Sequence, residues 1–325
     1  MKLQTKIILT TILLLCLAGG GVFLFNWRRD SRQETGSVDK INIQATIYPI
    51  AELSRQIGKD FVSINTITPI GQEAHDYEPT ARQLKQITDE ADIFIYNGAG
   101  IDPWAKDLTS KMSKANAVAL NLSQKVELLK ASGEEHADEE EKPEEVHSDS
   151  EYDPHFWLDP VLVKEQVRAI SELLQQKYPE RSNDFKMNQQ NFESELDKLD
   201  QDYKQQLSQC QVRKIVTSHS AFQYLGKRYN FEIVPIAGIS PDNEPSTQDL
   251  SQISSTAKDS GVKYVFFESL SNPKLSQTIA RETGAELLEL NPIENLTSDQ
   301  KLSDENYVNL MRQNLTNLKT AMQCR

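Results

Sequence analysis

A single apolar stripe along residues 181–208 is the sequence feature that most constrains how this chain can fold. Its side chains are spaced 4, 3, 4 and 4 residues apart and are Phe192, Leu196, Leu199, Tyr203 and Leu207. This spacing places them on one face of an α-helix roughly 40 Å long at 1.5 Å per residue. Because the helix lies between two stretches with alternating strand and helix patterns, we expect it to be a rigid connection between two domains.

The two flanking stretches alternate short apolar strand patterns with helical periodicity. Strands are predicted at residues 41–47, 61–68, 91–96 and 117–120 before the helix, and at 214–218, 232–237, 264–268 and 286–290 after it, with a last helix at about 305–323. This order favours parallel sheets with helices on both faces. We predict an α/β protein with two (βα)4-like lobes, residues 41–160 and 210–325, joined by a helical region at 161–209.

The N-terminus carries an export signal. Residues 7–25 contain no charge and follow Lys2 and Lys6, as in a signal peptide or an N-terminal membrane anchor, which we assign to residues 1–25. Residues 26–40 are polar and are predicted to be a tether. We therefore expect an extracytoplasmic or periplasmic protein, associated with the membrane if the segment is not cleaved.

Acidic residues are concentrated in one internal segment. The chain has 325 residues and a net charge of −13, which argues against nucleic acid as a partner. Residues 133–153 hold eleven acids and one lysine, so the rest of the chain is near neutrality. The segment 130–152 has almost nothing to bury and is predicted to be a loop.

Two cysteines, Cys210 and Cys324, lie after the predicted signal or anchor segment. An even pair in an exported protein suggests a disulfide, which would tie down the last helix. The alternative is two unrelated thiols, and the spacing leaves both readings open.

Three of the five histidines lie in short polar segments at the ends of apolar runs: His75, His155 and His219. In an α/β protein, loops leave strands there and ligands usually bind there. If the three imidazoles converge between the lobes, they form a site for a borderline-soft divalent metal, zinc first. Solvated loop histidines are the alternative. His136 and His147 lie in the acidic loop, where they are either a weak metal-collecting arm or part of a solvated charge run.

From about residue 41 to the C-terminus, the chain resembles the cluster A-I (cluster 9) zinc and manganese receptors of ABC importers, and the ZnuA-type zinc members in particular. The segments that carry the resemblance occur in the family's order and are residues 71–79, 92–98, 153–160, 217–222, 238–241 and 244–246. The resemblance implies two α/β lobes joined by a rigid helix, with the metal in the cleft between them.

The resemblance also implies a set of ligands. His75, His155 and His219 match the first three ligand positions, and a histidine at the third favours Zn²⁺ over Mn²⁺, which prefers oxygen. The fourth ligand of the family is an aspartate, and Asn291 stands at that position here. We expect Asn291, a water, Glu73 or Glu268 to complete the shell. Glu268 can instead orient a histidine from outside the shell.

The function implied is a high-affinity zinc receptor that delivers Zn²⁺ to a membrane permease driven by a cytoplasmic ATPase. We expect a monomer with no catalytic residues. The alternatives are a manganese or broad-specificity receptor, a zinc hydrolase and a metal-binding adhesin. The hydrolase is disfavoured because no general base lies at helical spacing from a ligand, as it does in His-Glu-x-x-His.

Overall fold

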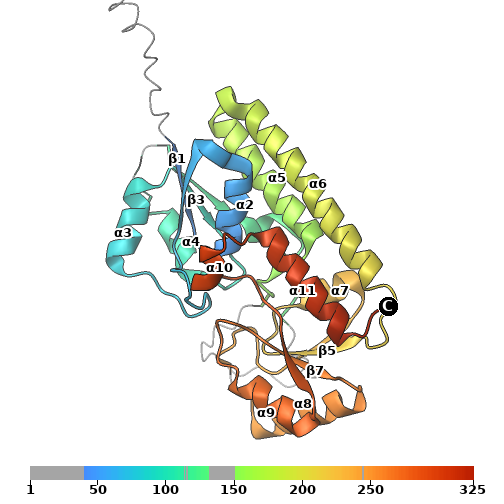
Figure 1. Cartoon of the computed structure of the whole chain (residues 1–325). Coiled ribbons are helices and arrows are strands. Elements are labelled where there is room, and N and C mark those ends of the chain that lie inside the picture. Colours follow the sequence, from blue (N-terminus) through green and yellow to red (C-terminus); the bar gives the residue numbers. More distant parts are fainter. Residues whose placement is uncertain (1–39, 113, 115, 132–150, 244) are drawn as a thin grey trace, which may run out of the picture. The chain divides into compact units, whose positions relative to one another are not determined.

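In a computed structural model, the two alternating stretches form two four-stranded sheets in which all paired strands are parallel (Figure 1). The first sheet has the order β2-β1-β3-β4 and consists of β1 (Ile41–Ala45), β2 (Val62–Thr66), β3 (Ile93–Tyr96) and β4 (Val118–Asn121). The second has the order β6-β5-β7-β8 and consists of β5 (Lys214–Thr217), β6 (Glu232–Pro235), β7 (Tyr264–Phe267) and β8 (Glu286–Glu289). The predicted α/β fold is confirmed.

The structure describes residues 40–112, 114, 116–131, 151–243 and 245–325. The predicted signal or anchor segment, the tether up to residue 39, and the part of the acidic loop that carries His136 and His147 lie outside the described residues. In the described part of the chain, no helix combines the length and the apolar character that a membrane span requires.

Helices cover both faces of the first sheet. On β3, Ile93 and Ile95 point into the main core, while Phe94 and Tyr96 point into a second cluster on the opposite face. This alternation follows from the two-residue period of a strand. The main core lies under α2 (Tyr48–Gly58) and α5 (Pro160–Lys177), and the second cluster under α3 (Ala81–Glu90) and α4 (Pro103–Thr109).

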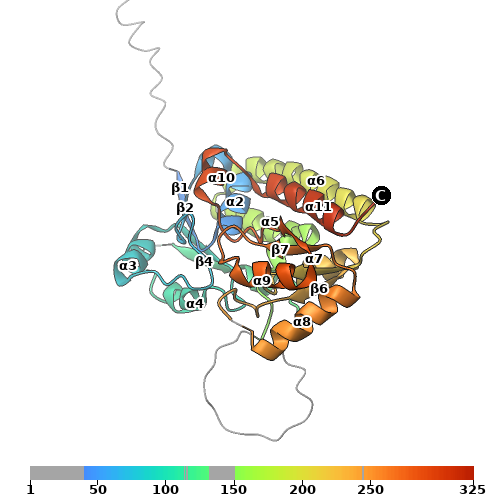
Figure 2. The ribbon, with the colours of Figure 1, turned by 60° about the horizontal axis from the view of Figure 1, so that its bottom comes forward.

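The second sheet is covered in the same way. Val265 of β7 packs with residues of α8 (Thr247–Asp259) and α9 (Lys274–Thr283), whereas the next residue, Phe266, joins the main core on the other face. That face carries α7 (Gln223–Tyr229) and α11 (Tyr307–Ala321). Figure 2 shows α8 and α9 together on one side of this sheet.

The long helix predicted at 181–208 is α6 (Ser182–Gln206), and its apolar stripe is buried. Near its start, Asn188 Nδ2 donates to the Ile57 carbonyl of α2 at 2.9 Å. Near its end, the Tyr203 hydroxyl donates to the Met311 carbonyl of α11 at 2.7 Å, and the Tyr229 hydroxyl of α7 donates to Asp200. The helix is therefore anchored to elements of both sheets, beside α5 (Figure 1).

Cys210 and Cys324 form a disulfide, as predicted for an exported chain. The bond joins the segment after α6 to the segment after α11, across 114 positions of sequence. A cross-link that closes so long a loop restricts the unfolded chain and stabilises the fold, typically by about 2–4 kcal/mol.

After β8, the chain crosses back to the first sheet before it enters α11. The Trp157 indole donates to the Pro292 carbonyl at 2.8 Å, and the Tyr48 amide donates to the Glu294 carbonyl at 3.3 Å. The short helix α10 (Ser298–Leu302) follows, next to the first sheet (Figure 1). Residues 290–297 thus lie against both halves of the molecule.

Candidate metal centre

Three imidazoles and one carboxylate meet between the two sheets. His75, His155, His219 and Glu294 each offer one ligand atom, and these four atoms lie within 4.8 Å of one another. The ring centroids of His155 lie 5.1 Å from those of His75 and 5.2 Å from those of His219. The structure therefore brings together the three histidines that the sequence singled out.

The spacing of these atoms matches a tetrahedral site. His155 Nε2 lies 3.1 Å from His75 Nε2 and 3.3 Å from His219 Nε2. Glu294 Oε1 lies 3.3, 3.4 and 3.6 Å from the Nε2 atoms of His155, His219 and His75. A tetrahedron with zinc–ligand bonds of about 2.0–2.1 Å has edges of about 3.3–3.4 Å. These five distances are close to tetrahedral edges, and all four atoms lie within 4.8 Å of one another, so they form a candidate site for one small cation.

Each of the four ligand residues lies in a loop next to the end of a strand or helix. His75 lies in the loop after β2, His219 two residues after β5, and Glu294 five residues after β8, so all three follow the carboxyl ends of parallel strands. Ligands in open α/β sheets bind at these ends. His155 precedes the short 3-10 helix η3 (Phe156–Leu158), and its neighbour Pro154 is held by Asn97 Nδ2 at the end of β3.

Two imidazoles are oriented by acids on their far side. His155 Nδ1 lies 2.8 Å from Asp153 Oδ1, and His219 Nδ1 lies 2.7 Å from Glu268 Oε1. Because a carboxylate accepts hydrogen bonds, Nδ1 is the donor in each ring and Nε2 faces the cluster, where its lone pair becomes available to a metal ion that displaces the Nε2 proton. Glu268 thus occupies the orienting position that was one of its two predicted roles, and Ser271 Oγ donates to its other oxygen.

The site is closed to solvent. The side chains of His155 and His219 are fully buried, and those of His75 and Glu294 are 6% exposed. Glu294 Oε1 is a buried oxygen without a hydrogen-bond donor among the described residues. A buried carboxylate oxygen that lacks a partner and points at three imidazoles is what a cation would satisfy.

The acids and imidazoles hold each other charged despite burial. Burial lowers the pKa of both His155 and His219, but nearby acids outweigh it. Glu268 raises the pKa of His219 well above its usual value, and the hydrogen bond with Asp153 raises the pKa of His155. Burial likewise opposes ionisation of Glu294, yet the neighbouring imidazoles of His75, His155 and His219 hold its pKa well below the usual range. Burial lowers the pKa of His75. Protons on the imidazoles therefore balance the carboxylates, and a divalent cation can replace them.

At the fourth position the sequence prediction named Asn291, a water, Glu73 or Glu268, whereas the structure places Glu294 beside the three histidines. Asn291 Oδ1 accepts a hydrogen bond from the Ile293 amide at 2.7 Å. The turn that follows puts Ile293 at a φ of +59°, in the left-handed region that a β-branched residue rarely adopts. This turn directs Glu294, three residues later than predicted, at the imidazoles.

Glu73, another candidate for the fourth position, lies next to the cluster without joining it. Its carboxylate accepts from the His75 amide at 2.9 Å and from the Asp76 amide at 3.3 Å. Burial and the neighbouring Glu294 raise the pKa of Glu73 to about 9, so it is protonated near neutral pH and is a poor metal ligand. Glu73 instead holds the backbone that carries His75.

Glu294 has no motif around it, which is why it was not predicted. One physical signal exists in the sequence: Glu294 and Asn295 interrupt an apolar segment after the last strand, and both are buried, with 5% and 2% exposed. A carboxylate is rarely buried without a charged partner or a metal.

Two parallel-sheet lobes joined by a long helix, with a buried set of ligands between them, define a two-lobed metal-binding receptor of the solute-binding class. Residues 43–321 match the family described as zinc-uptake complex component A, periplasmic, abbreviated ZnuA. The chain belongs to this family, as the sequence motifs indicated.

Two individual relatives are named for zinc uptake or zinc binding. The high-affinity zinc uptake system protein ZnuA of Bacillus subtilis is 34% identical over 284 residues, which cover 87% of this chain and 88% of the relative. The zinc-binding lipoprotein AdcA of Streptococcus pneumoniae R6 is 34% identical over 280 residues, and the match spans only 55% of its length.

Solved structures of the family share the fold. The Zn(II)-bound ZnuA-like domain of Streptococcus pneumoniae AdcA is 31% identical, covers 87% of this chain and 99% of its own, and superimposes with a TM-score of 0.73. The laminin binding protein of Streptococcus agalactiae, described as both adhesin and metal transporter, covers the same shares with 28% identity and a TM-score of 0.76.

Proposed function

We propose that this protein is the extracytoplasmic receptor of an ABC-type zinc importer, which captures Zn²⁺ between its two lobes and delivers it to the membrane permease. The observation that supports this most directly is the buried set of three imidazoles and one carboxylate whose ligand atoms all lie within 4.8 Å of one another. Zn²⁺ favours four-coordinate sites with nitrogen and carboxylate ligands. The partners are a permease with its cytoplasmic ATPase, and the receptor acts as an extracytoplasmic monomer that is associated with the membrane through its N-terminal segment if that segment is not cleaved.

The same geometry argues against a hydrolase. A catalytic zinc site has three protein ligands and leaves the fourth position open for water or substrate. Here the Glu294 carboxylate occupies the fourth corner and the cluster is closed to solvent. We therefore assign the site to binding and release of the ion, without catalytic residues.

Competition between Zn²⁺ and Mn²⁺ tests the assignment. We expect the metal-free protein to bind about one Zn²⁺ per chain and to prefer it over Mn²⁺ by about 100-fold or more, because Mn²⁺ favours more ligands and harder, oxygen-rich sites. Titration calorimetry with a competing chelator measures both affinities. Equal affinities, or a preference for Mn²⁺, would support the broad-specificity or manganese receptor instead.

Zinc affinity is expected to fall steeply on acidification. The raised pKa values of His155 and His219 mean that both imidazoles hold their protons to a higher pH than usual, and Zn²⁺ must displace these protons. The pKa of Glu294 lies well below its usual range, so this carboxylate stays ionised and contributes nothing to the change. From about pH 7.5 to about pH 5 we expect a loss of about 100-fold or more. An affinity that is constant across this range, measured by competition titration, would count against an imidazole site.

A further inference from the structure

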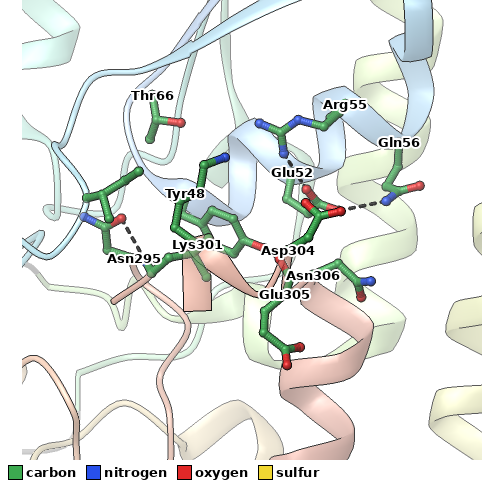
Figure 3. A pocket seen from close by; sticks show the side chains of 12 residues that line it. Tyr48, Glu52, Arg55, Gln56, Thr66, Asn295, Lys301, Asp304, Glu305 and Asn306 are labelled. Carbon is green, nitrogen blue, oxygen red and sulfur yellow. Dashed lines mark hydrogen bonds and ion pairs between the residues drawn. The ribbon is translucent and has the colours of Figure 1, made fainter. Parts of the chain in front are cut away.

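Asn295 is a buried amide that follows the ligand Glu294 and is not itself a member of the metal cluster. It is 2% exposed and lies in the wall of a cavity of about 240 Å³ between α2 and α10 (Figure 3). Asn295 Nδ2 donates to the carbonyls of Pro69 and Gln72 at 2.6 and 2.9 Å. Its Oδ1 accepts from the Leu296 amide at 2.8 Å. Both donors of the amide are therefore used on one loop of the first half of the molecule.

The loop at residues 69–72 leads from β2 to the ligand His75. All four of its residues are exposed, so burial of their side chains does not fix it. Gly71 adopts a φ of +81°, which favours glycine, and its amide donates to the Leu296 carbonyl at 2.9 Å. Together with the two bonds from Asn295, this hydrogen bond attaches the exposed loop to the segment after β8.

His75 differs from the other two imidazoles in how its ring is held. Each of the other rings has a carboxylate oxygen 2.7–2.8 Å from its Nδ1 atom. No residue in the described part of the chain hydrogen-bonds to Nδ1 of His75, whose contacts outside the cluster are made by its backbone amide with Glu73. The position of the His75 ring therefore depends on its backbone, and so on the loop that precedes it.

The segment that carries Asn295 is itself fixed in place. The Tyr48 amide donates to the Glu294 carbonyl at 3.3 Å, and the Trp157 indole donates to the Pro292 carbonyl at 2.8 Å. Tyr48 also lines the same cavity wall as Asn295 (Figure 3). Because Asn295 is the next residue after Glu294, its amide connects the backbone of this ligand to the loop of a ligand from the other half of the molecule.

We propose that Asn295 is a positioning residue of the metal site, which holds the loop before His75 against the segment that carries Glu294. It thereby keeps the His75 ring in the cluster without an acid at the Nδ1 atom of that ring. The inference rests on the proposed function, because it treats His75 as a ligand of the captured Zn²⁺. Outer hydrogen-bond partners of metal ligands typically change metal affinity by about 10–100-fold. Asn295 acts through the backbone, so we expect the lower end of this range.

A double-mutant cycle tests the inference, with zinc affinity measured by competition titration on the full chain in detergent micelles. Asn295→Ala should bind zinc about tenfold more weakly than the wild type. In a His75→Ala background, the same substitution should change the affinity by less than about twofold, because the ring that Asn295 positions is gone. In a His219→Ala background it should again cost about tenfold, because Glu268 and not Asn295 holds that ring.

Two further variants serve as controls. Asn188→Ala removes another amide that donates to a backbone carbonyl, between α6 and α2, so it should lower the melting temperature but leave zinc affinity within about twofold of the wild type. Asn295→Thr keeps one donor in a similar volume, and its affinity should lie between those of the wild type and Asn295→Ala. If circular dichroism shows that Asn295→Ala does not fold, the cycle is measured with Asn295→Thr.

The outcomes separate this inference from the proposed function. An equal loss of affinity in the wild-type and His75→Ala backgrounds would overturn the inference, because Asn295 would then act on the fold or on Glu294 and not through His75. Unchanged affinity of Asn295→Ala would overturn it as well. In both cases the wild type still binds zinc and the proposed function stands. If the wild type itself bound no zinc, the proposed function would fail and the inference with it.

Discussion

His155→Ala is expected to lower the zinc affinity by about 100- to 1000-fold. His155 Nε2 is the atom nearest to the other three ligand atoms, at 3.1, 3.3 and 3.3 Å. Zinc sites with four protein ligands bind with roughly 10–16 kcal/mol, so one ligand accounts for about 2.5–4 kcal/mol of it. Competition titration of the folded variant measures the loss.

The control for this experiment is the double variant His136→Ala with His147→Ala. These histidines lie in the acidic segment, outside the described residues. We expect the high-affinity site to remain, with an affinity within about threefold of the wild type. If the control lost as much affinity as His155→Ala, zinc would be held by the acidic segment and the cluster would not be the main site.

The second large effect is expected at the fourth corner of the site. Glu294→Gln keeps the size of the side chain but removes the buried negative charge that faces three imidazoles. Removal of one partner from a buried charge pair costs about 3–5 kcal/mol, so we expect at least a 100-fold loss of zinc affinity. The measurement is the same competition titration, with circular dichroism to confirm the fold.

Asn291→Asp is the matched comparison, because it places a carboxylate at the position that the sequence prediction named for the fourth ligand. We expect the zinc affinity of Asn291→Asp to stay within about threefold of the wild type, since the side-chain oxygen still accepts from the Ile293 amide. The new charge is 91% buried without a cation partner, so the melting temperature should fall. If Asn291→Asp bound zinc tenfold more tightly and Glu294→Gln had no effect, residue 291 would be the fourth ligand and Glu294 would not.

The fold was predictable because it depends on local periodicity. The apolar stripe from Phe192 to Tyr203 is a helix, and each predicted strand appears in its sheet. The predicted strands were too long at their carboxyl ends, by two residues at β1 and β2. Ile67 and Thr68 still donate to the carbonyls of Ala45 and Thr46, so the apolar pattern continues into the loops that approach the site.

The histidines were predictable and Glu294 was not, for a physical reason. His75 and His219 follow recognisable strands, and His155 lies in a distinctive motif between prolines. Glu294 reaches the cluster only because Ile293 adopts a left-handed conformation and Asn291 caps the turn. Neither the strained backbone nor the return of this segment to the first sheet leaves a periodic signal in the sequence.

X-ray absorption spectroscopy of the zinc-loaded full chain tests the central claim most directly. The account predicts about one zinc per chain, bound to three imidazole nitrogens and one carboxylate, with zinc–ligand distances near 2.0–2.1 Å and no sulfur. Fewer than three imidazoles in the scattering pattern, a shell made mainly of oxygen, or a sulfur ligand would contradict it.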